Sequence, residues 1–384
     1  MLIYKIHLTK FRNFKKKNFE FSPKTTVIVG PNASGKTNIL ESLFLFASGK
    51  SFRARLEEEM ISYNSSLARI VAVVGTMNKP LGTKGIIKNR DYSKYDKPTK
   101  LEVVLTRGEI EIGENRFEKA PRKRLLVNGL GRRLVDFIGN FRIVLFGPWD
   151  LDLVTESPSL RRRFLDTVLS QVDRDYRRAS LSYEKGLRQR NRLLWQIRED
   201  PSLVSGRARL LFWDKLLIKN GDYISRVREE FIDFVNESPD FDGQDFSLEY
   251  DKSAISETRL EQYREEEVAA ATTLVGPHRD DFVIKLKTQA SKSKEKEREL
   301  ARYGSRGEQR MGVLWLKLAE LSFIEEKTQE KPTLLLDDIF SELDHQHRKI
   351  VMRATKGQQT IITTADPHFI KNLNVDSIID LNGK

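Results

Sequence analysis

The chain of 384 residues contains no cysteine, and this absence excludes several classes of function. Without a thiol there is no disulfide framework, no thiolate metal site and no cysteine nucleophile. Histidine is also scarce, with five residues spread along the chain, which argues against a zinc enzyme. No apolar run approaches the ~18 residues that span a bilayer, and the N-terminus lacks the apolar core of a secretory signal. These absences predict a soluble, cytoplasmic protein.

Positive charge is in excess, because 67 Lys and Arg face 55 Asp and Glu and give a formal net charge of +12. Half of this excess lies within residues 156–198, which hold eleven Lys or Arg and five Asp or Glu. A basic cluster favours a polyanionic partner, either nucleic acid or an anionic membrane. A generic charge that keeps the protein soluble is the alternative interpretation.

A phosphate-binding loop follows the first buried strand. Residues 26–29 are short, β-branched and apolar, as in a strand buried on both faces. The loop GPNASGKT follows and matches GxxxxGK[ST], and an apolar helix is expected from Lys36. Glycines allow the backbone to approach phosphates, and the helix N-terminus favours their negative charge. The predicted nucleotide-binding residues are Gly30, Pro31, Asn32, Ala33, Ser34, Gly35, Lys36 and Thr37.

This loop predicts ATP and Mg²⁺ as ligands, and it requires a carboxylate at the end of a neighbouring strand. We expect Lys36 to bridge the β- and γ-phosphates and Thr37 to ligate Mg²⁺. The apolar run 334–336 ends in Asp337, which is predicted to hold the Mg²⁺ hydration shell. Asp338 is the predicted general base, or the residue that positions the attacking water.

A third motif, SRGEQR at 305–310, precedes another apolar helix. Taken alone it is a helix N-cap, which is common. With the phosphate-binding loop upstream and Asp337 downstream, it resembles the signature sequence of ABC-type ATPases, and Ser341 and Asp344 stand where their D-loop stands. In that class each ATP lies between the loop of one subunit and the signature helix of another. The resemblance therefore implies an ATP-dependent homodimer, with catalytic roles for Ser305 and Gln309.

The hydrophobic pattern divides the chain into a discontinuous α/β domain and a helical insertion. Residues 67–146 read as mostly β-strands, whereas residues 159–236 read as long helices broken near 201–206. The apolar positions from Leu210 to Phe234 are spaced alternately by three and four residues. Either a protruding arm or an ordinary helix pair in a compact lobe explains this seam, and Gly221 argues against one uninterrupted helix.

Together with this pattern, the resemblance to ABC-type ATPases implies an α/β fold: an ABC-type P-loop ATPase head with a mixed β-sheet, flanking helices and an antiparallel β subdomain, and an inserted all-helical second domain. Residues 1–156 and 271–384 are predicted to form the head, and residues 157–270 the arm-like helical domain.

The order and spacing of several segments resemble the bacterial RecF family. These segments are LTKFRNF (8–14), GPNASGKTNILES (30–42), SFR (51–53), FGPWDL (146–151), SPSLRRRFLD (157–166), QRN (189–191), GPHRDD (276–281), SRGEQR, LLLDDIFSELD and TTAD. The resemblance runs from residue 1 to about residue 366, which is more specific than any single motif.

The resemblance implies a recombination mediator, similar to a shortened SMC protein, that dimerises on ATP at gapped or single-strand/double-strand junction DNA. It implies slow, DNA-dependent ATP hydrolysis, a nucleoid-associated location, RecR and RecO as partners, and RecA loading as the outcome. A nucleotide-binding subunit of a transporter, or another SMC-like ATPase, is the alternative. Transporters usually carry Glu at the position of Asp338 and His in the switch strand, which leaves Asp366 or His368 as the γ-phosphate sensor.

The residues expected to bind DNA are basic and lie mostly in the helical region. Such side chains neutralise phosphates with little sequence preference. An intramolecular ion pair is the alternative for each of them, and Arg161–Arg163 have a rival role at the domain junction. The candidates are Lys15, Lys16, Lys17, Arg161, Arg162, Arg163, Arg177, Arg178, Arg188, Arg190 and Arg192.

Overall fold

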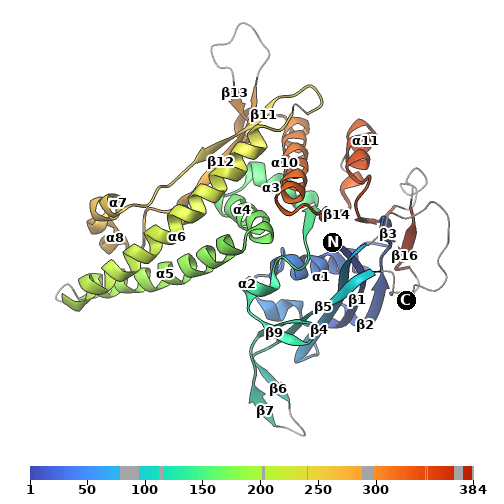
Figure 1. Cartoon of the computed structure of the whole chain (residues 1–384), viewed down its shortest axis with the longest axis horizontal. Helices are drawn as coiled ribbons and strands as arrows, with labels where there is room; N and C mark the ends of the chain where they lie inside the picture. Colours follow the sequence, from blue (N-terminus) through green and yellow to red (C-terminus); the bar gives the residue numbers. More distant parts are fainter. Residues whose placement is uncertain are drawn as a thin grey trace. The chain divides into compact units, whose positions relative to one another are not determined.

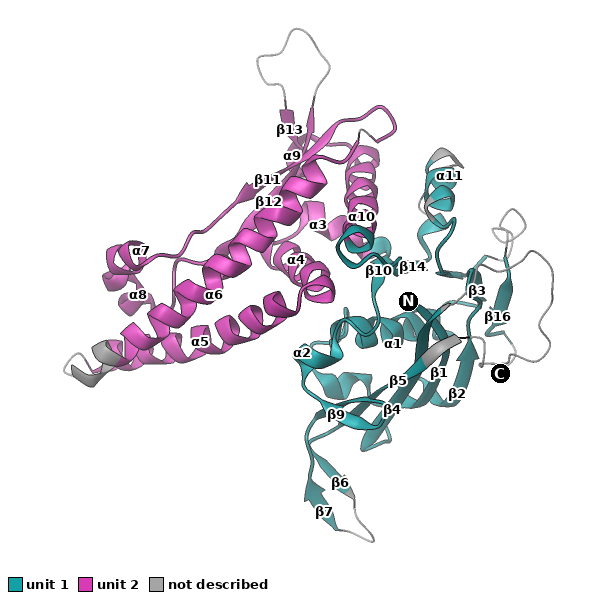
Figure 2. Cartoon of the chain, in the orientation of Figure 1, with its two compact units in different colours: residues 1–148, 324–384 teal, residues 149–323 magenta. Residues whose placement is uncertain are grey.

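The computed structural model describes residues 1–77, 95–111, 116–200, 204–239, 241–287, 297–341, 343, 345–366 and 375–382. They form two compact units, coloured separately in Figure 2: unit 1 comprises residues 1–148 and 324–384, and unit 2 comprises residues 149–323. Within these described ranges, no helix combines the length and apolar character that crossing a bilayer requires.

Unit 1 contains an antiparallel sheet, a parallel sheet and a small hairpin. Its elements up to the first break in the unit are β1 (Leu2–Phe11), β2 (Phe14–Glu20), β3 (Thr25–Val29), α1 (Lys36–Ser48), η1 (Glu57–Met60), β4 (Leu67–Met77), β5 (Tyr95–Thr106), β6 (Glu109–Glu111), β7 (Phe117–Lys119), β8 (Lys123–Val127), β9 (Leu130–Arg132), α2 (Leu134–Phe137) and β10 (Ile143–Phe146). Its C-terminal elements are β14 (Thr333–Asp337), η5 (Ile339–Ser341), α11 (His345–Ala354), β15 (Thr360–Thr364) and β16 (Ser377–Asp380).

The six-stranded sheet has the order β2-β1-β4-β5-β8-β9, and all its neighbours are antiparallel. One face is apolar, because alternate residues such as Ile6, Leu8 and Ile70 are fully buried. The turn between β8 and β9 is made by Asn128 and Gly129, which both have positive φ angles, 51° and 80°. Asn-Gly is the sequence that two-residue hairpin turns with two positive φ angles favour.

The five-stranded sheet has the order β10-β14-β15-β3-β16 and is parallel throughout. Every residue of β3, β14 and β15 is buried, as expected for strands covered on both faces. Helix α1 contacts β10, β14 and β15 of this sheet and β5 of the antiparallel sheet. The phosphate-binding loop therefore leads into a helix that packs against both sheets (Figure 1).

Unit 2 is mostly helical but also contains a three-stranded sheet of order β11-β12-β13. Its elements are η3 (Pro148–Leu151), α3 (Asp152–Thr155), α4 (Pro158–Val172), α5 (Arg174–Glu199), α6 (Val204–Asn236), β11 (Phe246–Asp251), α7 (Glu257–Gln262), α8 (Arg264–Ala270), η4 (Pro277–Arg279), β12 (Asp281–Lys287), β13 (Glu297–Glu299), α9 (Leu300–Tyr303) and α10 (Arg306–Thr328).

Helices α5 and α6 form an antiparallel pair along the predicted seam, on which α7 and α8 also pack (Figure 1). The expectation that Gly221 interrupts the second helix is wrong, since α6 is continuous over 33 residues. A Cβ atom at Gly221 would lie 2.7 Å from Ile255 and 3.2 Å from Pro277. The glycine therefore allows the chain around these residues to pack closely on α6.

The two units do not divide the chain where the sequence analysis divides it. The predicted helical domain, 157–270, contains the strand β11, so it is not all-helical. This strand pairs with β12, and Phe246 of β11 packs against Trp315 of α10. Those contacts bring residues 271–323, including SRGEQR, into unit 2.

Candidate nucleotide-binding site

The predicted phosphate and metal residues of unit 1 meet at one edge of the parallel sheet. In the register of the sheet, Asp337 of β14 is paired with Thr363 of β15, and Thr363 is paired with Ile28 of β3. The loop that contains Lys36 begins just after β3. Because parallel strands end at a common edge, residues over 300 positions apart in the sequence lie in neighbouring strands there.

The loop has the backbone geometry of a phosphate cradle. Ala33 and Gly35 have positive φ angles of 65° and 105°, and Gly35 caps α1. A Cβ atom at Gly35 would lie 2.7 Å from both Asn13 and Phe14, and one at Gly30 would lie 2.7 Å from Ser34. Close contacts therefore favour glycine at both positions, and the positive φ favours it at Gly35 as well. The first amides of α1 have no partner within the helix and point toward the cradle.

The loop presents two polar side chains, Lys36 and Ser34, that suit a nucleotide's phosphates. The Lys36 ammonium is buried and donates to the carbonyls of Gly30 (2.7 Å) and Pro31 (3.0 Å). Burial lowers the pKa of Lys36, and the carboxylates of Asp338 and Asp337 oppose that shift. The Ser34 hydroxyl is buried with no hydrogen-bond partner among the described residues. Such an orphaned group in a glycine-rich loop fits a phosphate oxygen.

The two aspartates at the C-terminal end of β14 are held differently. The Thr363 hydroxyl donates to Asp337 Oδ1 at 2.5 Å and accepts from the Asp338 amide at 3.1 Å, which ties both residues to β15. Asp337 is buried, whereas Asp338 is half-buried and has a positive φ of 51°. No cluster of three acidic or histidine side chains suited to a metal occurs in the described part of the chain. A Mg²⁺ ion held by Thr37 and Asp337 would thus need phosphate and water oxygens as well.

A hydrogen-bonded network joins the loop to two segments that the family resemblance had singled out. Asn13 donates to the Ser34 carbonyl (3.1 Å) and accepts from Asn38 of α1 (2.9 Å). One turn later, Glu41 is fully buried and accepts two hydrogen bonds from Arg12, at 2.8 and 2.6 Å. Ser51 and Arg53 also donate to Glu41. Burial alone would raise the pKa of Glu41, but these donors outweigh it and lower the pKa.

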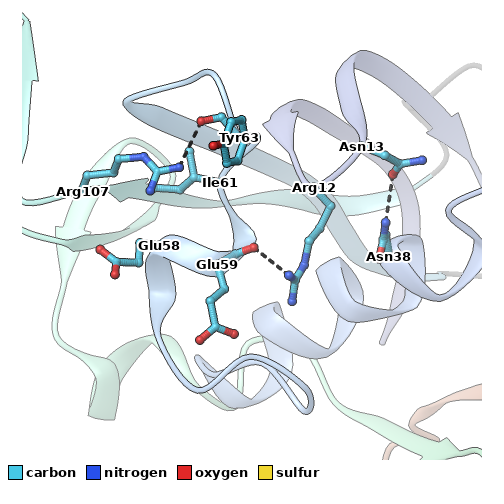
Figure 3. A pocket seen from close by; sticks show the side chains of 8 residues that line it. All are labelled: Arg12, Asn13, Asn38, Glu58, Glu59, Ile61, Tyr63 and Arg107. Atoms are coloured by element: carbon cyan, nitrogen blue, oxygen red, sulfur yellow. Dashed lines mark hydrogen bonds between the residues drawn. The ribbon is translucent and has the colours of Figure 1, made fainter.

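The same network borders a pocket of about 510 Å³. Figure 3 shows Arg12, Asn13 and Asn38 on one side of it, with Tyr63 and Arg107 on the other. Arg12 also donates to the Glu59 carbonyl at 2.6 Å. Sequence motifs alone assign no role to Asn13, Asn38 or Glu41. Their contribution is visible only in the structure, where their hydrogen bonds link the loop and α1 to neighbouring segments.

The signature segment belongs to unit 2, where it starts α10. Ser305 and Glu308 form a capping box: the Ser305 amide donates to Glu308 Oε2 (2.8 Å) and the Glu308 amide donates to Ser305 Oγ (3.3 Å). Burial would raise the pKa of Glu308, but hydrogen bonds from Ser305 and the charge of Arg298 lower it. Ser305 and Gly307 are exposed, so this helix N-terminus is open to a ligand.

The catalytic role predicted for Gln309 needs correction. Its side chain is buried, and its amide group donates to the Leu300 carbonyl at 3.0 Å. In this structure Gln309 holds α9 against α10 and does not face solvent. Of the D-loop residues, Ser341 ends η5, whereas Asp344 lies outside the described residues, as does His368.

Two of the predicted DNA-binding arginines also need correction, because their charges are already used inside unit 2. Arg161 forms two hydrogen bonds with Asp281, at 2.6 and 2.8 Å, and is buried. Arg190 is 2% exposed and pairs with Asp214 (2.6 Å) and Glu267 (2.7 Å). A buried guanidinium with carboxylate partners is not available to a phosphate outside the protein.

The remaining basic candidates differ in exposure. Arg162 is half-buried and donates to the Asp280 carbonyl (2.8 Å), and Arg177 is buried and donates to the Ser170 carbonyl (2.5 Å). Arg178 and Arg188 are exposed but form ion pairs within α5, with Asp175 (3.4 Å) and Glu184 (3.2 Å). The exposed candidates also include Lys15, Lys16, Lys17, Arg163 and Arg192.

Comparison with known proteins identifies the family. The model of the RecF/RecN/SMC N terminal domain matches residues 2–382. The DNA replication and repair protein RecF of Herpetosiphon aurantiacus is 34% identical, and the alignment covers 97% of each chain. The protein of the same name from Lachnoclostridium phytofermentans is 33% identical over 97% of this chain and 95% of its own. The chain belongs to the RecF family.

Solved structures support the same assignment. A structure of the recombination mediator protein RecF with ATP, described as part of the RecFOR pathway, has a TM-score of 0.77 and 29% identity and covers 95% of this chain and 92% of its own. A second RecF structure has a TM-score of 0.79 and 28% identity, with 99% of this chain and 95% of its own covered. The predicted RecF resemblance and α/β fold with a helical insertion are confirmed. The chain is thus a DNA replication and repair protein of the recombination-mediator type, with an SMC-like ATP-binding head.

Proposed function

We propose that the chain is a slow, DNA-dependent ATPase in which ATP and Mg²⁺ drive homodimerisation on gapped or junction DNA. RecR, RecO and RecA would act with it in the cytoplasm, at the nucleoid. The observation that carries the proposal is the edge of the parallel sheet, where Lys36, Asp337 and Asp338 converge on one glycine-rich loop. The ATP-bound RecF structure and the RecFOR description of both solved relatives support the ligand and the partners.

Each residue of the loop has a defined task once ATP supplies its triphosphate. Lys36 would exchange the Gly30 and Pro31 carbonyls for phosphate oxygens, and Ser34 would gain the partner that its hydroxyl lacks. Thr37 and Asp337 would hold Mg²⁺ beside them, with Thr363 fixing the Asp337 carboxylate. Asn13 would keep the loop in place through the Ser34 carbonyl.

Asp338 is the group best placed to accept a proton from water, because it follows Asp337 and is only half-buried. We expect Asp338→Asn to fold normally, since asparagine tolerates the positive φ at this position. ATP hydrolysis should fall by ~10²–10⁴-fold, as for loss of a general base, while ATP-dependent dimerisation persists. Single-turnover hydrolysis measured beside sedimentation tests this. Unchanged hydrolysis would remove Asp338 from the mechanism.

Ser305 would bind the nucleotide of the second copy. The capping box organises the start of α10 and leaves Ser305 exposed, which suits a phosphate brought by another subunit. Hydrolysis would remove this contact, so the dimer would loosen and release DNA.

Sedimentation on gapped DNA, with and without ATP, tests the proposal. Lys36→Met should lose ATP binding and dimerisation, whereas Ser305→Arg should bind ATP as a monomer. Ser305→Asp sharpens the test, because aspartate caps a helix well but repels phosphate. The matched control is Ser256→Asp, since Ser256 caps α7 by accepting from the Arg259 amide. If both Ser305 variants dimerised normally with ATP, Ser305 would not bind the nucleotide of the second copy.

A further inference from the structure

A second basic segment of the chain lies outside the helical cluster. Residues 116–133, called the basic ribbon below, contain seven Lys or Arg and one Glu. The helical segment 156–198 needs 43 residues to reach the same excess of six. Nothing in the nucleotide site uses the basic ribbon.

Most of the ribbon is β-structure in unit 1: it contains β7, β8 and β9, and residues 120–122 between β7 and β8 belong to no strand. The β6–β7 hairpin extends the ladder between β5 and β8, because the Ala120 amide donates to Gly108 (2.9 Å) and the Thr106 amide donates to Arg122 (2.9 Å). Figure 1 shows β6 and β7 projecting beyond the six-stranded sheet. At ~3.3 Å per residue, the run from Arg116 to Arg124 is roughly 25 Å long. Strand β9 then folds back beside β8, with Arg132 opposite Leu125, so Arg132 lies on the same sheet face as Leu125 and Arg124 lies on the other face.

Some cations of the ribbon are used within the protein. Lys123 is held by the Gly49 carbonyl (3.0 Å) and Glu57, and Arg122 by Glu58 (3.3 Å). Arg133 pairs with Asp136 (3.4 Å). Among the described residues, four exposed cations of the ribbon make no ion pair: Arg116, Lys119, Arg124 and Arg132. Lys119 lies opposite Glu109 in the hairpin, so it is the least available of the four.

The common reason for cations on an outer strand is protection of the edge against pairing with another chain. This reason covers Arg132, which lies on the edge strand β9. It does not cover Arg124, because β8 is paired on both sides, with β5 and β9. Protection of the edge strand β9 also does not explain the cations that lie elsewhere on the ribbon, such as Arg116.

We infer that the sheet edge formed by the basic ribbon binds the phosphate backbone of duplex DNA, with Arg132 on one face of this edge and Arg124 on the other as its principal contacts. The inference rests on the DNA binding proposed above and specifies its surface. Duplex DNA carries one charge per ~1.7 Å of axis, so a basic segment roughly 25 Å long spans many phosphates. Binding of single strands generally uses a row of aromatic platforms. Phe117 is the one aromatic residue of the ribbon, which favours the duplex.

The test is the salt dependence of duplex binding by the full chain, with ATP held at one concentration. Both arginines are exposed, so Arg124→Gln/Arg132→Gln should fold normally. The logarithmic salt slope should become shallower by ~1.8, at ~0.9 per lost phosphate contact. The matched control is Arg226→Gln/Arg264→Gln, which removes the same charge from exposed positions of α6 and α8 outside both basic clusters and should leave the slope unchanged.

The outcomes separate this inference from the proposed function. If wild-type protein binds no DNA, the proposed function fails. If it binds and the ribbon variant keeps the wild-type slope, the ribbon inference fails while the function stands. Equal weakening of duplex and single-stranded oligonucleotide binding would overturn the duplex assignment. Equal weakening for polyglutamate would reduce the ribbon to a general polyanion surface and overturn the inference as well.

Discussion

The two basic clusters have the same excess of positive charge but different fates in the structure. In the helical cluster of unit 2, Arg161 and Arg190 are buried against carboxylates and Arg188 is paired along its own helix. In the basic ribbon of unit 1, Arg124 and Arg132 are exposed and without ion pairs among the described residues. A count of charges therefore does not identify a binding surface. What matters is whether each cation has an internal partner.

The largest expected effect separates a structural arginine from a surface one. Arg190→Ala should lower the free energy of unfolding by ~3–5 kcal/mol, because Asp214 and Glu267 are left without their buried partner. Arg188→Ala should cost at most ~0.5 kcal/mol, since its pair with Glu184 is exposed. Urea unfolding of both variants measures the difference. If both variants lost the same small amount of unfolding free energy, Arg190 would again be a candidate for surface DNA binding.

The interior that holds Arg190 also holds a histidine, and this predicts a loss of stability in acid. His278 Nε2 donates to the Thr273 carbonyl (3.0 Å), so Nδ1 accepts from the Tyr183 hydroxyl (2.8 Å) and the ring is neutral. Burial lowers the pKa of His278 from 6.5 to about 4. Between pH 6.5 and about pH 4, His278 is protonated in the unfolded chain but neutral in the folded chain. The free energy of unfolding therefore falls as the pH falls through this range. The loss is about 3 kcal/mol.

Urea midpoints between pH 7 and pH 4 check this expectation against His278→Gln, which retains a donor for Thr273. The variant should lack most of the acid-dependent loss attributable to this side chain. If wild type and variant have parallel pH profiles, His278 is protonated in the folded protein. The interior of unit 2 would then accommodate a charged group without a carboxylate partner, and burial alone would not explain why Arg161 and Arg190 are paired.

Motifs were predictable where the chemistry lies in adjacent residues. The loop at 30–37, the helix that begins at Lys36 and the aspartates at the end of β14 are all found as expected. The buried arginines were not predictable, because their partners are remote: Asp281 is 120 residues from Arg161, and Thr273 is 83 residues from Arg190. The effect of Gly221 was not predictable for the same reason. The residues that pack where its Cβ would lie, Ile255 and Pro277, are in a later segment of the chain. A window count of charge would have found the basic ribbon, because it needs no knowledge of the fold.

The smallest expected effect tests whether the helical cluster contributes to DNA binding at all. Glu184→Gln releases Arg188 from its ion pair and should cost at most ~0.5 kcal/mol of stability. If the ribbon makes the principal contacts, the salt slope of duplex binding should stay at the wild-type value, because the freed charge lies away from the phosphates. A slope steeper by ~0.9 would show that one more phosphate is contacted. That result would bring α5 into the DNA surface, and the contrast between the two clusters would then hold only for their buried members.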